Sequence, residues 1–245
     1  MLQEFCRRIR IQATDKGIRD LIAILKALPP GHPLENLLHE APDFSQEVEL
    51  ADALLNPQDR AYSVPQLFDL IKKAGLAFGR WLKQAPYLPY CGALSNIPLK
   101  NRIARLPLAE QFSAVELFRG TLARHSVILY RNDSSWYPHP VSFTGDAWSH
   151  YIPLHMSDTI CVKERLPQGA AAVLINQTHT FKDLFMLINA TEKHWYEAID
   201  GRRRIEEIIQ EKIGSSQKST YLNMARTFFE RLWWYDQVVF DASGQ

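Results

Sequence analysis

The fold is decided by the stretch Asp59-Arg60-Ala61-Tyr62-Ser63-Val64-Pro65-Gln66-Leu67-Phe68-Asp69-Leu70-Ile71-Lys72-Lys73-Ala74-Gly75-Leu76, which continues as Ala77-Phe78-Gly79-Arg80-Trp81. Ser63 and Gln66 form an S-x-x-Q capping box at the start of a predicted helix. Pro65 fits the first turn of this helix, because a missing N–H is harmless there. Apolar residues recur at helical spacing over 64–74, and Gly75 can close the helix. The stretch therefore predicts a helix that leads directly into a strand.

This run resembles the late part of a class I S-adenosylmethionine-dependent methyltransferase. In that family, a helix ending in Ala-Gly-Leu or Ala-Gly-Phe leads into the sixth strand, which pairs with an antiparallel seventh. The seventh strand is similar to His125-Ser126-Val127-Ile128-Leu129-Tyr130-Arg131, and a mid-domain helix of the bacterial members is similar to Met1-Leu2-Gln3-Glu4-Phe5-Cys6-Arg7-Arg8. The resemblance implies an antiparallel pair over 77–83 and 126–131 at the edge of a larger sheet. It also implies that the half of the enzyme that holds the cofactor precedes residue 1.

Composition limits the class of protein. The chain has 245 residues, of which 46% are hydrophobic and 11% aromatic, enough for one large domain or two small ones. A net charge of +1 provides no global field for nucleic acid or an anionic membrane. The three cysteines are far apart and odd in number, which favours free thiols in a reducing compartment. With no apolar run of about 18 residues, we expect a cytoplasmic protein without a membrane partner.

The expected fold class is α+β and mainly helical, in three parts. Residues 1–131 are expected to form the late half of a methyltransferase-like domain with a helical lid. Residues 132–140 are expected to be a linker, because Asn132-Asp133-Ser134-Ser135 is followed by two prolines. Residues 141–245 are expected to form a winged-helix-like domain.

The predicted helices and strands follow from the spacing of apolar residues and from the positions of prolines and glycines that end helices. In the first part they are helices over about 18–28 (capped by Thr14 and stopped by Pro29-Pro30), 34–39, 47–55 and 107–124. The last of these, inserted between the two family strands, would act as a lid or substrate wall. In the third part they are strands over 159–162, 170–175 and 184–188, helices over 191–199, 204–213 and 218–234, and a final strand over 237–240.

A second resemblance concerns the third part. Residues 198–208, Ala-Ile-Asp-Gly-Arg-Arg-Arg-Ile-Glu-Glu-Ile, are similar to the Asp-Gly-x-x-(Thr/Ser)-(Ile/Val)-x-Glu-Ile turn of small winged-helix modules. Peptide-binding proteins of the pyrroloquinoline quinone pathway carry this turn, as do the carboxyl-terminal domains of some methyltransferases. Arg204 replaces the usual Thr or Ser, which weakens the helix cap. Asp200-Gly201 should form the turn between the first two helices.

Binding of nucleic acid by this part is not expected. A DNA reader needs an exposed recognition helix rich in cations and amides, whereas 218–234 carries a mostly apolar stripe. Leu222, Phe228, Phe229 and Leu232 should be buried in that helix, and Trp234, which lies off the stripe, could cover a seam between domains. Packing against the methyltransferase domain or against a partner is the favoured interpretation.

The sequence contains no motif that would bind the cofactor. The family holds S-adenosylmethionine against a glycine-rich loop that follows its first strand, but the eleven glycines here are scattered and no G-x-G occurs. The resemblance implies S-adenosylmethionine for the intact enzyme, while no cofactor is expected on this chain alone. The histidine spacings and the lack of Cys-x-x-Cys predict no metal site, and no G-x-S-x-G elbow supports a hydrolase.

The candidate substrate-binding residues lie beside the predicted helix and lid. Arg60 and Tyr62 precede the capped helix, whereas Tyr87, Arg119 and His125 flank the lid. Methyl transfer depends largely on positioning the acceptor, and some acceptors need a general base, but no catalytic residue is assigned. Three of these candidates have a structural alternative: pairing with Asp59 or a helix end for Arg60, solvation for Arg119, and a helix terminus that favours a cation for His125.

The sequence thus predicts the substrate-side and carboxyl-terminal portion of an S-adenosylmethionine-dependent methyltransferase, inactive as this chain alone. Its partners would be an amino-terminal cofactor-binding domain or a separate chain, together with an unidentified methyl acceptor. The alternative is a non-catalytic protein-interaction module that docks on a separate cofactor-bearing chain.

Overall fold

The protein is α+β, as expected, with small antiparallel sheets. The computed structural model describes residues 2–32, 46–56, 58, 60–120, 122, 124–133, 141–210 and 218–243. The helices are α1 (Leu2–Arg8), α2 (Asp15–Lys26), α4 (Glu47–Leu55), α5 (Val64–Lys73), α6 (Lys100–Ile103), α7 (Leu108–Arg119), α8 (Ala190–Glu197), α9 (Ile205–Gln210) and α10 (Lys218–Trp234), with short 3₁₀ turns η2 (Ala85–Tyr87), η3 (Gly92–Asn96) and η4 (Ala147–His150). The strands are β1 (Leu76–Trp81), β2 (Val127–Arg131), β3 (Ile152–His155), β4 (Thr159–Val162), β5 (Ala172–Asn176), β6 (Phe185–Ile188) and β7 (Val238–Asp241). They form the sheets β1–β2, β3–β7 and β4–β5–β6.

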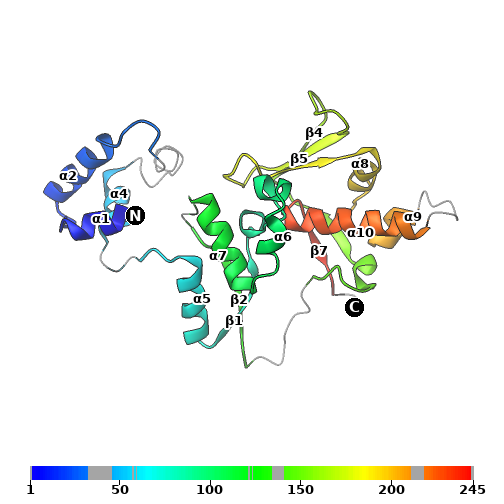
Figure 1. Cartoon of the computed structure of the whole chain (residues 1–245), viewed down its shortest axis with the longest axis horizontal. Helices are drawn as coiled ribbons and strands as arrows, with labels where there is room; N and C mark the ends of the chain where they lie inside the picture. Colours follow the sequence, from blue (N-terminus) through cyan, green and yellow to red (C-terminus); the bar gives the residue numbers. More distant parts are fainter. Residues whose placement is uncertain are drawn as a thin grey trace.

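The amino-terminal helices have a core of their own. Leu21 and Cys6 are buried there, together with apolar residues of α4, and Figure 1 shows α1, α2 and α4 grouped apart from the rest of the ribbon. The predicted cap of α2 is confirmed, because Thr14 Oγ1 accepts a hydrogen bond from the Gly17 N–H at 3.2 Å. The predicted helix 47–55 coincides with α4, whereas the one over 34–39 lies outside the described residues.

The predicted helix and antiparallel strand pair are confirmed. The Ser63 N–H donates to Gln66 Oε1 at 3.0 Å, and Gly75, with φ +66°, ends the segment before β1. β1 and β2 pair antiparallel, with an irregularity beside Gly79. The Tyr130 ring lies across this glycine, so a Cβ there would come within 2.3 Å of a ring carbon. α5 and α7 pack with this pair around a core that holds Val64, Trp81, Tyr87 and Phe112.

The predicted helix 107–124 is too long. α7 ends at Arg119, because Gly120 takes a left-handed φ of +69°. Phe112 and Val115 are buried as expected, but Leu108 and Phe118 are about half exposed. The shorter helix leaves His125 in the segment that leads into β2, not at a helix terminus.

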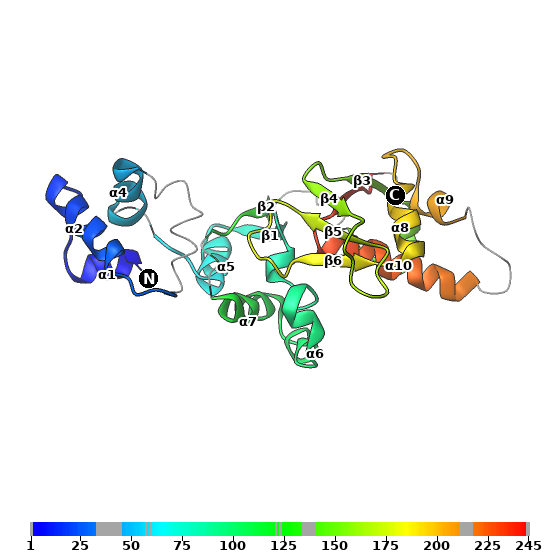
Figure 2. The ribbon, with the colours of Figure 1, turned by 90° about the horizontal axis from the view of Figure 1, so that it is seen from above.

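The carboxyl-terminal part follows the predicted element order closely. β4 and α10 have the predicted bounds, while β5, β6, α8 and β7 are shifted by one or two residues, and α9 is described only as far as Gln210. β3 was not predicted; it is a four-residue strand that contains Pro153 and pairs with β7. Phe228, Phe229 and Leu232 are buried, as predicted, in a core that α10 shares with α8, α9 and strands β5 and β6, but Leu222 is only partly buried. Figure 2 shows α10 lying beside this group of strands and α8.

No helix in the described part of the chain is long and apolar enough to span a membrane.

The turn between α8 and α9 has the predicted geometry. Gly201 has φ +73°, and Asp200 Oδ1 accepts hydrogen bonds from the N–H groups of Arg202 and Arg203, both at 2.9 Å. The hydrogen bond from the Arg203 N–H, followed by that from Arg202, lowers the pKa of Asp200 to about 2. The turn therefore depends on a glycine conformation and an adjacent carboxylate.

Replacing Gly201 with alanine is expected to lower the free energy of unfolding by about 1 kcal/mol, because the left-handed backbone disfavours a Cβ. The space itself is adequate, since a Cβ at this position would lie 3.9 Å from its nearest neighbours, two carbons of Leu154. Urea unfolding followed by circular dichroism measures the loss. Gly201→Asn is the control and should lose less, because asparagine tolerates this conformation; equal stability of Gly201→Ala and the parent would contradict the prediction.

Candidate functional site

Three side chains from different elements form a buried chain of hydrogen bonds. The Tyr87 hydroxyl lies 2.7 Å from His125 Nδ1, and His125 Nε2 lies 3.2 Å from Glu116 Oε1. Because a carboxylate oxygen accepts, Nε2 carries a hydrogen, and in the neutral imidazole Nδ1 then accepts from the tyrosine, whose hydroxyl also lies 3.4 Å from the Arg124 carbonyl. The Tyr87 ring stacks on Trp81 with centroids 3.8 Å apart and planes 6° apart. η2, α7 and the segment before β2 are thereby joined at one point.

Glu116 also fixes the beginning of α5. Its carboxylate accepts a hydrogen bond from the Val64 N–H at 2.9 Å, a donor that α5 leaves unpaired within the helix. Burial, with a smaller contribution from the Glu116 charge, raises the pKa of Tyr87 well above its ordinary value. The tyrosine hydroxyl therefore stays protonated. Through these contacts the three side chains hold α7 against α5 and η2.

Arg119 is a buried bridge, so its interpretation as a solvated residue is wrong. Its side chain is 3% exposed, and Nη1 lies 3.1 Å from Asp183 Oδ1. Nε donates to the Pro86 carbonyl at 2.8 Å, and the guanidinium lies 4.5 Å from the centre of the Phe181 ring. Asp183 also accepts from the Ala93 N–H at 2.7 Å. Arg119 thus joins α7 and η2 to the segment before β6.

Asp236 is the centre of a second buried polar cluster. Its carboxylate accepts from the Ala85 N–H at 2.9 Å, from Arg80 Nη2 at 3.4 Å and from His179 Nε2 at 3.2 Å. The Arg80 guanidinium also lies 3.9 Å from the centre of the Trp233 ring. No local motif marks these residues, so the sequence did not reveal the cluster. It connects β1 and η2 to the end of α10.

The five sequence candidates divide into two groups. Tyr87 and His125 are in direct contact, and Arg119 bonds the carbonyl next to Tyr87. Arg60 and Tyr62 contact each other instead, with the guanidinium 5.2 Å from the ring centre, in the segment before α5. The proposed pairing of Arg60 with Asp59 lies outside the described residues.

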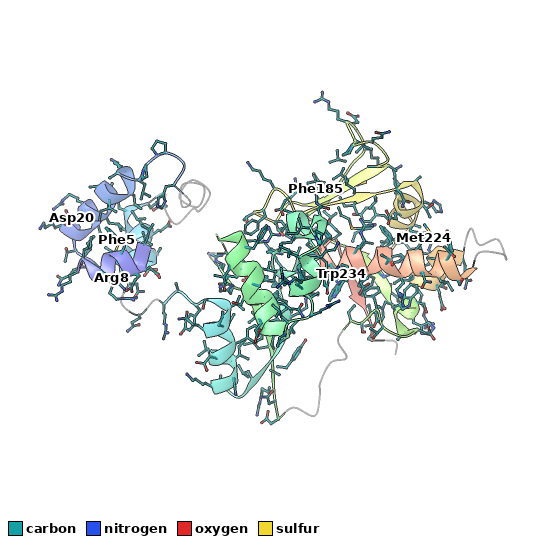
Figure 3. All side chains as sticks on the ribbon, in the orientation of Figure 1. Phe5, Arg8, Asp20, Phe185, Met224 and Trp234 are labelled. Carbon is teal, nitrogen blue, oxygen red and sulfur yellow. The ribbon has the colours of Figure 1, made fainter. Side chains whose placement is uncertain are left out.

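Aromatic stacking contributes to the seam, the region in which residues 76–131 contact the carboxyl-terminal part. Trp234 stacks on Tyr90 with centroids 4.7 Å apart, which agrees with the expectation that this tryptophan covers a seam. Figure 3 shows Trp234 in the middle of the molecule, at the carboxyl-terminal end of α10. Gln84 Nε2 donates to the Trp233 carbonyl at 2.7 Å. Both polar and aromatic contacts therefore hold the two sides of the seam together.

No family model matches this chain. Its function is therefore inferred from the arrangement of these residues. Among the described residues, no three His, Cys, Asp or Glu side chains are grouped so that they could hold a metal ion. All described strand pairs are antiparallel, whereas a glycine-rich nucleotide cradle normally follows a strand of a parallel sheet.

Asp183 should make the seam sensitive to acid. Burial alone would raise the pKa of Asp183, but the Ala93 N–H and the Arg119 guanidinium together lower it below its ordinary value of 3.8. A carboxyl whose pKa is depressed in the folded state stabilises above its unfolded pKa and loses that effect as the pH falls through the folded pKa. The stability difference between the parent and Asp183→Asn should therefore be largest near neutral pH and shrink below about pH 4.

Urea unfolding at a series of pH values measures this difference. Asp69→Asn is the control, because Asp69 makes an exposed ion pair with Lys73 and exposed pairs contribute little. A difference between the parent and Asp183→Asn that stays constant from neutral to acid pH would show that this carboxylate does not stabilise the seam as an anion.

Proposed function

We propose that this chain is the substrate-side and carboxyl-terminal portion of an S-adenosylmethionine-dependent methyltransferase. The cofactor is held by an amino-terminal domain or by a separate chain. The observation that carries the proposal is the run α5–Gly75–β1 with its antiparallel partner β2, because its order and direction match the late elements of that family. The substrate-side role then falls to α7 and the residues around it.

The β1–β2 pair is also suited to receive further strands. It is a sheet of two strands in the described part of the chain, and such ribbons are marginally stable alone. A strand at a sheet edge presents unpaired N–H and C=O groups. α5 and α7 cover one face through the core around Trp81 and Phe112, and Arg80 anchors β1 to Asp236. The pair is thus held in place while its outer edges have no strand neighbour among the described residues.

The chain of Tyr87, His125 and Glu116 supports a positioning role in this enzyme. Methyl transfer from a sulfonium is an in-line displacement, so the alignment of acceptor and methyl group supplies much of the rate. By holding α7 to α5 and η2, the three side chains fix the wall that would face the acceptor. Tyr87 and His125 are the sequence candidates in this arrangement, and Glu116 is a residue that the sequence did not single out.

The second candidate function, a non-catalytic interaction module, is favoured by a different surface. The register of β4, β5 and β6 places Ile160, Ile175 and Phe185 in one row, and Val162, Val173 and Leu187 in the next, on one face. Ile160, Phe185 and Leu187 are about 40% exposed. Contiguous exposed apolar side chains of this kind are typical of docking surfaces.

The two candidates can be separated on the native assembly, purified through a carboxyl-terminal affinity tag. S-adenosylmethionine binding is measured by equilibrium dialysis, and hydrogen exchange is measured on the assembly and on the 245-residue chain. The methyltransferase proposal predicts cofactor binding by the assembly and slower exchange over 126–133. The interaction module predicts slower exchange confined to 159–188. An assembly that neither binds the cofactor nor protects 126–133 would overturn the main proposal.

A matched pair of variants identifies the surface that is used. Leu187→Ser places a hydroxyl on the apolar face of β4–β5–β6, whereas Met224→Ser makes the same kind of change at a comparably exposed site on α10. Under the main proposal, both variants leave cofactor binding by the assembly unchanged. Loss of the partner in Leu187→Ser alone would favour the interaction module.

A further inference from the structure

A small hollow opens between the end of β5 and the start of β6. Its volume is about 280 Å³, and its lining comprises Ile175, Asn176, Gln177, His179, Thr180, Phe181, Lys182, Leu184 and Phe185. Two phenyl rings and two aliphatic side chains make the wall mostly apolar. This volume lies near the lower limit of ligand pockets, which suits a molecule built on one aromatic ring.

His179 lines the hollow and has a buried ring nitrogen without a hydrogen-bond partner among the described residues. Its side chain is 1% exposed, and Nε2 lies 3.2 Å from Asp236 Oδ2. Because the carboxylate accepts, Nε2 carries a hydrogen, and in the neutral imidazole Nδ1 keeps a free lone pair. Nδ1 is buried with no hydrogen-bond partner among the described residues, although buried polar atoms are nearly always paired. For the neutral imidazole, the group that pairs with Nδ1 must therefore be a donor.

The surrounding contacts hold this imidazole and the apolar wall in place. Asp236 is itself fixed by the Ala85 N–H and by Arg80, so the histidine is oriented from behind. Phe181 is covered by the Arg119 guanidinium at 4.5 Å. A site whose side chains are already fixed loses little entropy when a ligand binds.

The rim of the hollow is cationic. Lys182 is exposed at its edge, and Lys83 is nearby because its Nζ donates to the Thr178 carbonyl at 2.6 Å. The adjacent carboxylate, Asp183, is already engaged by Arg119 and by the Ala93 N–H. A carboxylate on the ligand would complement this rim.

We propose that the hollow binds a small phenolic carboxylate. The ring lies against Phe181 and Phe185, the phenol hydroxyl donates to His179 Nδ1, and the carboxylate faces Lys182. This ligand site is independent of the methyltransferase proposal, because its lining residues all lie outside the β1–β2 pair and none of its contacts requires a cofactor.

Calorimetric titration with 4-hydroxyphenylacetate, without any cofactor, tests the site. Phenylacetate lacks the donor and 4-hydroxyphenethylamine lacks the carboxylate, so each should bind about tenfold more weakly. His179→Gln can still donate to Asp236 but offers no acceptor at the Nδ1 position, and should also lose about tenfold in affinity for 4-hydroxyphenylacetate. Lys182→Ala should weaken binding as well, whereas Lys26→Ala, on α2, should leave it unchanged.

Nitrogen-15 NMR spectra of the histidine side chains test the site in the parent protein, so no substituted variant has to fold. The Nδ1 resonance of His179 should move on addition of 4-hydroxyphenylacetate, and should not move with phenylacetate. Equal affinity for the two acids, an unmoved Nδ1 resonance, or no binding of 4-hydroxyphenylacetate at millimolar concentration would overturn the proposal. None of these outcomes bears on the cofactor measurements, so the two proposals fail separately.

Discussion

Replacing Trp81 with alanine is expected to lower the free energy of unfolding by about 3–5 kcal/mol, the usual range for a large aromatic residue removed from a core. The Trp81 side chain is almost fully buried, stacks on Tyr87 and meets Phe112 edge to face with centroids 5.4 Å apart. Its loss would leave a cavity behind the chain of Tyr87, His125 and Glu116. Guanidinium unfolding followed by far-ultraviolet circular dichroism measures the change.

Trp81→Phe is the matched control for this prediction. Trp81 Nε1 is buried without a hydrogen-bond partner among the described residues, so phenylalanine removes no hydrogen bond and keeps an aromatic ring in the core. We expect a loss below about 1.5 kcal/mol. Equal losses for the alanine and phenylalanine variants would show that the packing of this ring does not determine the stability of the site.

Replacing Arg119 with methionine is expected to lower the free energy of unfolding by about 3 kcal/mol, the lower end of the range for one partner removed from a buried ion pair. The lower end applies because Asp183 is one-third exposed and can regain water. The variant would also leave the Pro86 carbonyl without its 2.8 Å donor. Urea unfolding measures the stability, and limited proteolysis should show faster cleavage along the seam.

The control for Arg119 is an exposed ion pair of the same chemistry. Arg131 and Asp133 pair at 2.6 Å but are both largely exposed, so Arg131→Met should cost less than about 1 kcal/mol. The double variant Arg119→Met with Asp183→Asn should lose less than the sum of the two single variants, because each already removes the shared interaction. Additive losses would contradict a direct pairing.

Elements defined by local signals could be predicted from the sequence. The Ser63–Gln66 box and Gly75 determine α5 and the start of β1, and β-branched or apolar runs determine β4 and β5. The Asp200-Gly201 turn also follows from a local rule, since glycine adopts a positive φ without strain. These signals act between residues close together in the chain, so they can be recognised in a single sequence.

Elements that depend on distant partners could not be predicted in this way. β3 has four residues and a proline, and becomes a strand because β7 pairs with it from the other end of the domain. The burial of Arg119 depends on Asp183, 64 residues away, and the cluster of His179 and Asp236 joins residues 57 apart. The end of α7 at Gly120 was missed because a lone glycine also occurs inside helices, at a cost of about 1 kcal/mol.

The most direct test of the central claim is a calorimetric titration of S-adenosylmethionine into the 245-residue chain by itself. If the chain is the substrate-side portion of a methyltransferase whose cofactor is held elsewhere, the titration should show no heat of binding beyond dilution. One-to-one binding with micromolar affinity would contradict this division of the enzyme, because the cofactor site would then lie within this chain.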